Sequence, residues 1–242
     1  MGSISIALVV RFDTIRAAVY YAVQRGWMIL QYDVKTVFLH GTLSEVVFME
    51  LPQGSAAPGN TKICRLIKSL YGLKQAPHMW NKTLHRHLVA LGFVRLESDH
   101  GLYGLHEQGE IVMLLTVYVD DLLLMGTSQR CEAVATQLAT SFELVALGPV
   151  KYLLGVEVVV DRELRTVFFS QAAYIEELLR RFHMKDCRGV ATPEGGTSDI
   201  EQERVDATQI DTLPYREIIG ALQYLVSGSR PDIAHVVRRL GQ

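Results

Sequence analysis

The sequence is poor in cysteine and in net charge. It has three cysteines among 242 residues, Cys64, Cys131 and Cys187. Because their number is odd and their spacing wide, they predict neither a disulfide framework nor a cysteine-ligated metal site. Lysine and arginine number 24 against 26 acidic residues, a net charge of −2. This balance excludes nucleic-acid binding through bulk charge, so any such contact must be local.

The sequence also lacks an apolar run long enough to span a membrane. Its central apolar run, residues 113–125, is shorter than the roughly 20 residues of a spanning helix and contains two aspartates. Residues 1–11 have no positively charged start and no small-residue cleavage site, so they do not resemble a signal peptide. We therefore expect a soluble, intracellular protein without a membrane segment.

The central run carries the strongest chemical signal, because Asp120 and Asp121 interrupt otherwise nearly apolar residues. The β-branched residues before them predict a buried strand that turns back on itself. Burying an unpaired carboxylate is costly and two adjacent ones repel, so the pair is expected to lose its charge by taking up protons, or to meet a cation. Oxygen ligands with no nearby cysteine or histidine favour magnesium. A solvent-facing turn is the alternative, but it does not explain the apolar flanks.

A second signal is the absence of any aspartate or glutamate from residue 51 to residue 96. A surface of one charge sign predicts contact with a phosphate backbone, and a solvated helix face is a nearly equal alternative. The seven basic residues of this stretch are Lys62, Arg65, Lys68, Lys74, Lys82, Arg86 and Arg95.

Apolar periodicity, with helix start and stop signals, predicts the elements around these two stretches. We expect strands over 27–34, which brings Asp33 to its end, over 150–160 and over 167–170, besides the hairpin within 113–125. Predicted helices cover 13–24, 77–91, 128–142, 171–183, 214–228 and 231–240. In helix 77–91, the spacing of Trp80, Leu84, Leu88 and Leu91 predicts the buried face. The segment 189–213 is rich in Gly, Thr, Asp and Glu and predicts a flexible linker.

Five motifs in this order resemble the reverse transcriptase domain of copia-type long-terminal-repeat retrotransposons, and the resemblance covers nearly the whole chain from Arg11 onward. The motifs are Tyr-Asp-Val-Lys-Thr-Val-Phe-Leu-His-Gly (32–41), Ser-Leu-Tyr-Gly-Leu-Lys-Gln-Ala-Pro (69–77), Tyr-Val-Asp-Asp (118–121), Leu-Gly-Pro-Val-Lys-Tyr-Leu-Leu-Gly-Val-Glu (147–157), and Tyr-Arg-Glu-Ile-Ile-Gly-Ala-Leu-Gln-Tyr-Leu with Ser-Arg-Pro-Asp-Ile-Ala (215–234). Five motifs in the order and spacing of one family make chance a poor explanation.

The resemblance implies an α+β fold, with a palm-type antiparallel sheet, packed helices and a helical thumb-like C-terminal region. Residues 1–188 would form the reverse transcriptase palm with partial fingers and the start of the thumb. Residues 189–213 would be the flexible linker, and residues 214–242 a C-terminal helical segment belonging to a truncated connection region.

The resemblance also implies the activity, an RNA-directed DNA polymerase that transfers nucleotides from deoxynucleoside triphosphates (dNTPs) to a primer 3′-hydroxyl on an RNA or DNA template. Two Mg²⁺ ions, for which Mn²⁺ can substitute, would be held by the catalytic Asp33, Asp120 and Asp121 and by the carbonyl of Val34. The implied roles of other residues are nucleotide binding for Phe38, Gln75 and Tyr118, a primer grip for Leu153, Leu154 and Gly155, and template contact for Lys68, Lys74, Lys82 and Arg86.

The sequence departs from the family pattern in a few places. Val37 stands where alanine is usual, and His40 where asparagine is common. The fingers region upstream and the RNase H domain downstream are expected to be missing, which predicts a polyprotein fragment. The family resemblance implies that it is located in a cytoplasmic retrotransposon particle.

Two alternative functions stay open. One is a catalytically silent retroelement remnant that at most binds nucleic acid. The other is an unrelated acidic-pair phosphotransferase, which ranks last because the sequence has no glycine-rich phosphate loop. The primer and the oligomeric state are left open.

Overall fold

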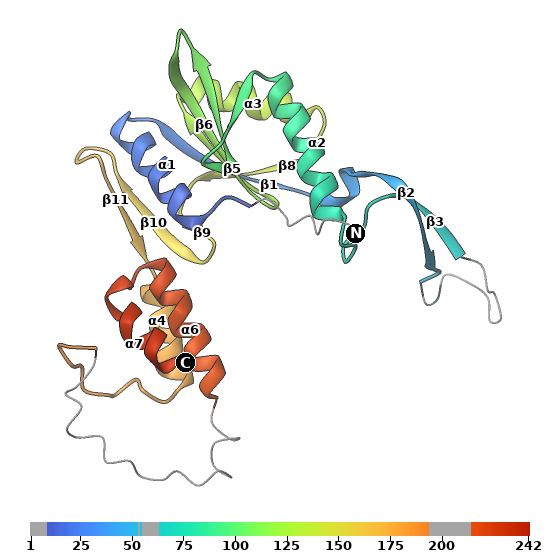
Figure 1. Ribbon diagram of the computed structural model, residues 1–242. Helices are drawn as coiled ribbons and strands as arrows, with labels where there is room; N and C mark the ends of the chain where they lie inside the picture. Colours follow the sequence, from blue (N-terminus) through green and yellow to red (C-terminus); the bar gives the residue numbers. More distant parts are fainter. Residues whose placement is uncertain (1–8, 53, 55–62, 194–213) are drawn as a thin grey trace. The chain divides into compact units, whose positions relative to one another are not determined.

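The computed structural model describes residues 9–52, 54, 63–193 and 214–242. The chain forms two compact units, residues 1–150 with 161–166, and residues 151–160 with 167–242. Figure 1 shows the elements of each unit. Within the described ranges, no helix is both long and apolar enough to cross a membrane.

The first unit contains a large sheet, its covering helices and a separate hairpin. Its elements are α1 (Phe12–Gln24), β1 (Met28–Val34), the 3₁₀ helix η1 (Val37–His40), β2 (Thr42–Glu50), β3 (Ile63–Lys68), α2 (Ala76–Ala90), β4 (Phe93–Leu96), β5 (Asp99–Glu107), β6 (Glu110–Tyr118), β7 (Asp121–Gly126), α3 (Ser128–Ala139) and β8 (Leu144–Pro149). Among the described residues, strands β2 and β3 pair with each other in a separate two-stranded sheet.

The second unit combines a small sheet with helices. Its elements are β9 (Tyr152–Leu153), β10 (Val156–Asp161), β11 (Thr166–Ser170), α4 (Ala172–Arg181), α6 (Tyr215–Gly228), the 3₁₀ helix η2 (Pro231–Ile233) and α7 (Ala234–Leu240). The strands lie in the order β11-β10-β9. Leu178 of α4 packs with Ala221 and Leu225 of α6 in a small apolar cluster.

The large sheet has six antiparallel strands in the order β4-β5-β6-β7-β1-β8. Its central strands β6 and β7 are nearly continuous apolar runs, which explains why most of their residues are buried on both faces. Leu122 and Leu124 of β7 face α2 and α3, whereas the alternate residues Leu123 and Met125 face the side covered by α1. The sheet is therefore the middle layer between α1 and the pair α2 and α3.

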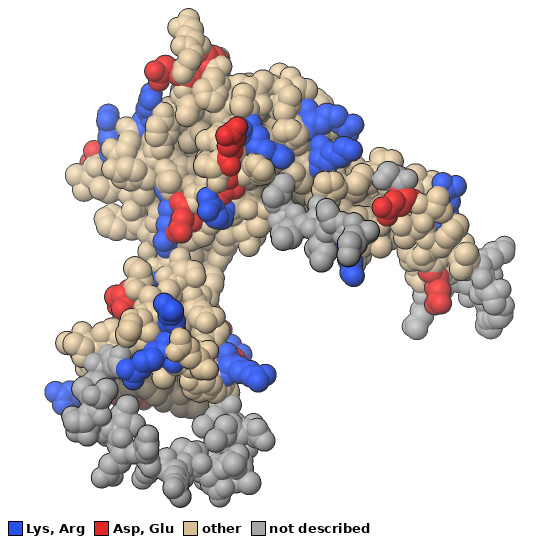
Figure 2. Space-filling model, viewed as in Figure 1, with Lys and Arg blue, Asp and Glu red and all other residues tan. Residues whose placement is uncertain are grey.

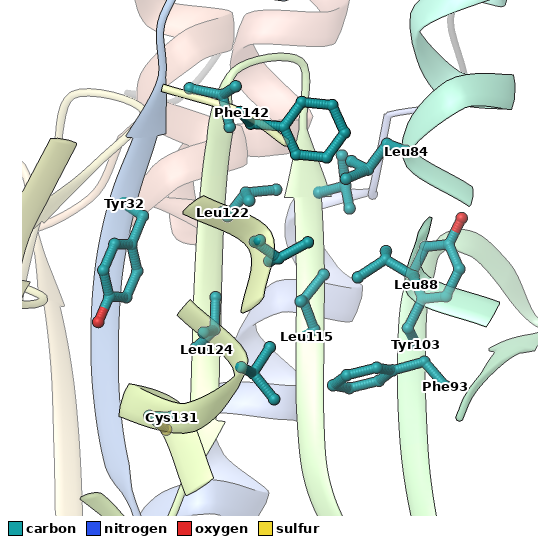
Figure 3. Close-up of a cluster of buried hydrophobic side chains, with 14 of the residues drawn as sticks. Tyr32, Leu84, Leu88, Phe93, Tyr103, Leu115, Leu122, Leu124, Cys131 and Phe142 are labelled. Atoms are coloured by element: carbon teal, nitrogen blue, oxygen red, sulfur yellow. The ribbon is translucent and has the colours of Figure 1, made fainter. Parts of the chain in front are cut away.

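The core on the α2 and α3 side is built from large side chains with little or no exposure (Figure 3). Leu115, Leu122 and Leu124 from the sheet meet Leu84 and Leu88 from α2. The buried positions of α2 follow the helical spacing that the sequence predicted. This packing fixes the middle of β7, the strand that begins at Asp121.

The predicted mixed α+β class with antiparallel sheets is confirmed, and so are the six helices, with shifts of a few residues at their ends. Two of them end early or start late: 128–142 ends at Ala139, and 231–240 begins with a 3₁₀ turn. The predicted linker 189–213 lies mostly outside the described residues.

The single strand predicted over 150–160 is wrong. Leu154 and Gly155 have positive φ angles of 50° and 79°, so the chain turns between β9 and β10. Strand β8 was not predicted from the sequence, because the Gly148-Pro149 pair at its end is typical of a turn or loop. Proline is tolerated there because β8 is an edge strand.

Candidate active site

The β1–β7 register brings two of the three predicted carboxylates together. Asp33 lies directly opposite Asp121 on the neighbouring strand, and side chains of opposed residues lie about 4.5–5.5 Å apart at Cβ. Val34 N–H donates to the Asp120 carbonyl at 2.9 Å, which fixes the turn against the end of β1. Asp33 and Asp121 share the sheet face opposite α2 and α3, because their neighbours Tyr32 and Leu122 face the helices.

The turn between β6 and β7 is held in a strained conformation. Val119 has a φ of 56°, a region that β-branched residues rarely adopt and that costs about 1–3 kcal/mol. The indole N–H of Trp80 donates to the Val119 carbonyl at 2.7 Å, and Trp80 itself is buried. Helix α2 thus stabilises the turn that positions Asp120 and Asp121.

Each carboxylate has a different environment. Asp120 is exposed. The Gln31 side-chain amide donates to Oδ1 of Asp121 at 3.2 Å, and the Lys35 ammonium lies 2.6 Å from Oδ2 of Asp33. Burial raises the pKa of Asp121, the Gln31 hydrogen bond lowers it, and the negative charges of Asp120 and Asp33 raise it further. Repulsion within the group is therefore part of the cost of the folded state.

The donor atoms fit a hard divalent cation, because the three side chains at this turn offer carboxylate oxygens alone. Their present arrangement is not that of a ligand set: in the part of the chain that the structure describes, no three or more His, Cys, Asp or Glu residues are grouped so that they could hold a metal ion. Asp33 is instead paired with Lys35. The three aspartates therefore match a metal site in their ligand chemistry and in their position on the strands. Their side chains must reorient to bind a metal.

Replacing the half-buried carboxylate of Asp121 by an amide is expected to stabilise the metal-free protein. The pKa of Asp121 is raised in the folded state. The contribution of Asp121 to the free energy of unfolding is therefore fully present below the pKa of this residue in the unfolded chain, and it is lost as pH rises through its pKa in the folded chain. Asp121→Asn removes the charge and keeps an acceptor for Gln31. We expect the free energy of unfolding at pH 7 to rise by about 0.5–1 kcal/mol.

Urea unfolding with a chelator measures this effect, which should shrink below about pH 4, where the unfolded carboxyl is protonated as well. Asp13→Asn is the matched control, because the Asp13 side chain is 93% exposed. A loss of stability in Asp121→Asn at pH 7 would contradict the argument.

The predicted nucleotide-binding residues do not share the lining of one cavity beside the turn. Phe38, in η1, stacks edge-to-face on Tyr71 with ring centroids 4.8 Å apart. It lines a cavity of about 80 Å³ together with Trp80 and Val119. Tyr118 is the half-buried last residue of β6. Gln75 precedes α2 and is absent from the lining of that cavity, and Val37 is buried in the core.

The predicted template-contact residues are all exposed. Lys82 and Arg86 lie one turn apart on the outer face of α2, Lys74 lies in the loop before it, and Lys68 ends β3. In Figure 2, blue side chains gather over the α2 region. The stretch therefore presents positive charge to solvent. Lys62, another member of the acid-free stretch, lies outside the described residues.

The predicted primer-grip residues belong to the second unit. Leu153 is buried, and Leu154 and Gly155 form the turn between β9 and β10. The Tyr224 hydroxyl on α6 donates to the Leu154 carbonyl at 2.7 Å. A Cβ at position 155 would lie 2.4 Å from that hydroxyl, so only glycine fits this close approach.

Several residues of the site were missed by the sequence reasoning. Gln31 and Asp33 alternate along β1, so period-two spacing puts both on one face and is a signal that could have found Gln31. Lys35 follows directly after the strand and pairs with Asp33. Trp80 was assigned to the core only, and Tyr71 had no assigned role. Their contacts with Val119 and Phe38 join segments far apart in sequence, and no local pattern indicates them.

The opposed carboxylates thus lie at a hairpin turn of an antiparallel α+β domain. Residues 4–195 match the family described as Reverse transcriptase (RNA-dependent DNA polymerase), and the chain belongs to this family. Its resemblance to the reverse transcriptase domain of copia-type retrotransposon polyproteins is confirmed. Members of such a family generally use divalent metal ions.

The similar proteins come from plants and yeast. The chain is 35% identical over 236 residues to the "Retrovirus-related Pol polyprotein from transposon TNT 1-94" of Nicotiana tabacum, covering 95% of this chain and 18% of that protein. It is 36% identical over 237 residues to the "Retrovirus-related Pol polyprotein from transposon RE1" of Arabidopsis thaliana, covering 97% and 16%. The "Putative transposon Ty5-1 protein YCL074W" of Saccharomyces cerevisiae is 29% identical over 212 residues, covering 87% and 68%. The chain thus spans less than a fifth of each plant polyprotein.

Proposed function

We propose that this chain is the palm and part of the thumb of an RNA-directed DNA polymerase that extends a primer on an RNA or DNA template with dNTPs. The observation that carries the proposal is the register of Asp33 opposite Asp121, with Asp120 at the adjoining turn. The six-stranded sheet with its helices would be the palm. Residues up to 188 would complete the palm and begin the thumb, 189–213 would be a linker, and 214–242 a helical segment of the connection region.

In the proposed mechanism, Asp33, Asp120 and Asp121 would hold two Mg²⁺ ions, and the Val34 carbonyl would be a further ligand. Ions bound there would lower the pKa of the primer 3′-hydroxyl and offset the charge that develops on the leaving pyrophosphate. No side chain acts as the nucleophile. The Trp80 hydrogen bond to Val119 keeps the turn in place, so that the two hairpin carboxylates need not be repositioned at each turnover.

The remaining residues would hold the substrates. Phe38 would support the sugar of the incoming nucleotide, and Gln75 and Tyr118 would contact the nucleotide or the nascent pair. The exposed Lys68, Lys74, Lys82 and Arg86 would pair with template phosphates, a contact that weakens as salt rises. Leu153, Leu154 and Gly155 would hold the primer.

Primer extension on a poly-rA/oligo-dT duplex, first with Mg²⁺ and then with Mn²⁺, tests the proposal. Extension that depends on the added metal and on dTTP supports it. Absence of extension with both metals, while the chain still binds the duplex, would overturn it in favour of a retroelement remnant that binds nucleic acid without catalysis.

The position of Phe38 leads to a prediction about sugar selection. An aromatic ring beneath the sugar leaves no room for a 2′-hydroxyl, so Phe38→Ala should lower the preference for deoxynucleotides. A steric difference of this size in a pocket changes the preference between two substrates by about 10- to 100-fold. The measurement is the ratio of dTTP to UTP incorporation in single-nucleotide extension.

Phe168→Ala serves as the control, since this phenylalanine of β11 is 61% exposed and should leave the ratio unchanged. An unchanged ratio in Phe38→Ala as well would refute the assigned role.

A further inference from the structure

Lys35 forms an ion pair with Asp33, one of the carboxylates that the proposed metal site needs. Its ammonium lies 2.6 Å from Oδ2 of Asp33, and the two side chains are 50% and 22% exposed. This distance is short even for a charge-assisted hydrogen bond. Lys35 follows directly after β1, two residues beyond Asp33, and its side chain reaches back to that carboxylate.

The Lys35 ammonium also experiences the other negative charges of the site. It pairs directly with Asp33, and backbone hydrogen bonds hold Asp120 against Val34 and Glu143 against Lys35 itself. In the folded chain Lys35 therefore partly neutralises the carboxylates around the turn. This arrangement explains why repulsion among them is tolerated when no metal ion is bound.

The backbone around the pair is fixed, whereas the lysine side chain is free to move. Lys35 N–H donates to the Glu143 carbonyl at 2.9 Å, and Val34 N–H donates to the Asp120 carbonyl at 2.9 Å. The half-exposed lysine can release Asp33 by rotating its four-carbon side chain into solvent, without any change in β1. Glu143 is exposed beside it.

We propose that Lys35 is an internal counter-cation which holds Asp33 in the metal-free protein and competes with the divalent ion for this carboxylate. The inference rests on the proposed function, since it concerns the same three aspartates. Lys35 is a positioning residue: it sets the orientation of Asp33 and the affinity of the site, and takes no part in the chemical step.

The test is the affinity of the full chain for Mn²⁺ in the absence of nucleotide and nucleic acid. Electron paramagnetic resonance measures the concentration of free Mn²⁺. In Lys35→Met the competing charge and its repulsion of the metal are gone, so the Kd for Mn²⁺ should fall at least about threefold. Lys35→Arg keeps the charge and should remain close to the wild type. Lys185→Met removes one exposed lysine in the other unit and should also match the wild type.

The variants separate the two proposals. An unchanged or higher Kd in Lys35→Met, with Mn²⁺ binding still lost in Asp120→Asn, would overturn the role of Lys35 and leave the metal site in place. Mn²⁺ binding that Asp120→Asn leaves intact would overturn the metal site and the role of Lys35 together. Circular dichroism confirms that each variant is folded.

Discussion

Asp120→Asn is expected to reduce metal-dependent primer extension by about 1,000-fold or more. The exposed Asp120 and the opposed pair Asp33 and Asp121 supply the only side-chain oxygens that our mechanism assigns to the metal ions. The amide cannot carry the negative charge that a hard cation requires. A 1,000-fold loss corresponds to about 4 kcal/mol of transition-state stabilisation, which is in the range of a lost metal-ion contribution.

The change should act on the rate and leave the fold intact. Asp120 lies on a turn, and its side chain is exposed, so the thermal midpoint should be close to that of the wild type. Asp13→Asn makes the same chemical change on the exposed surface of α1 and should extend primers normally. Extension by Asp120→Asn at more than a tenth of the wild-type rate would reject the assigned role.

Leu124→Ala is expected to lower the free energy of unfolding by about 3–5 kcal/mol. Leu124 has no exposed surface and lies at the centre of the cluster between β7, α2 and α3 (Figure 3). Truncation removes buried apolar surface and leaves a cavity, because close-packed neighbours relax only in part. Urea unfolding, followed by circular dichroism, measures the loss.

Leu147→Ala is the matched control, because Leu147 belongs to β8 of the same sheet but is 52% exposed. Its truncation should cost about 0.5 kcal/mol or less. Equal losses in the two variants would mean that the packing around β7 does not dominate the stability of the sheet.

Local patterns predicted the hairpin and most helices well. In the stretch 113–125, two carboxylates between apolar flanks required a strand that turns, and β6 and β7 have this form. In α2, the spacing of Trp80, Leu84 and Leu88 predicted the buried face. Such signals are strong because neighbours along the chain generate them, and one element contains the whole pattern.

Local patterns failed where distant contacts override propensity. Strand β5 has two glycines and few β-branched residues, so its sequence does not indicate a strand. Its Gly101 is needed because a Cβ there would lie 2.4 Å from the backbone nitrogen of Val10. The predicted strand 150–160 contained a suitable apolar run, yet the Tyr224 hydroxyl bonds to Leu154 at the turn that divides it.

The sequence by itself determined the family, the hairpin that carries Asp120 and Asp121, and the acid-free surface before and along α2. The tertiary structure decided which carboxylates meet and what accompanies them. Only the β1–β7 register places Asp33 opposite Asp121, and only folding brings Trp80 to the Val119 carbonyl. The physical reason is that periodicity specifies the face on which a side chain lies, whereas its partner depends on how separate elements pack together.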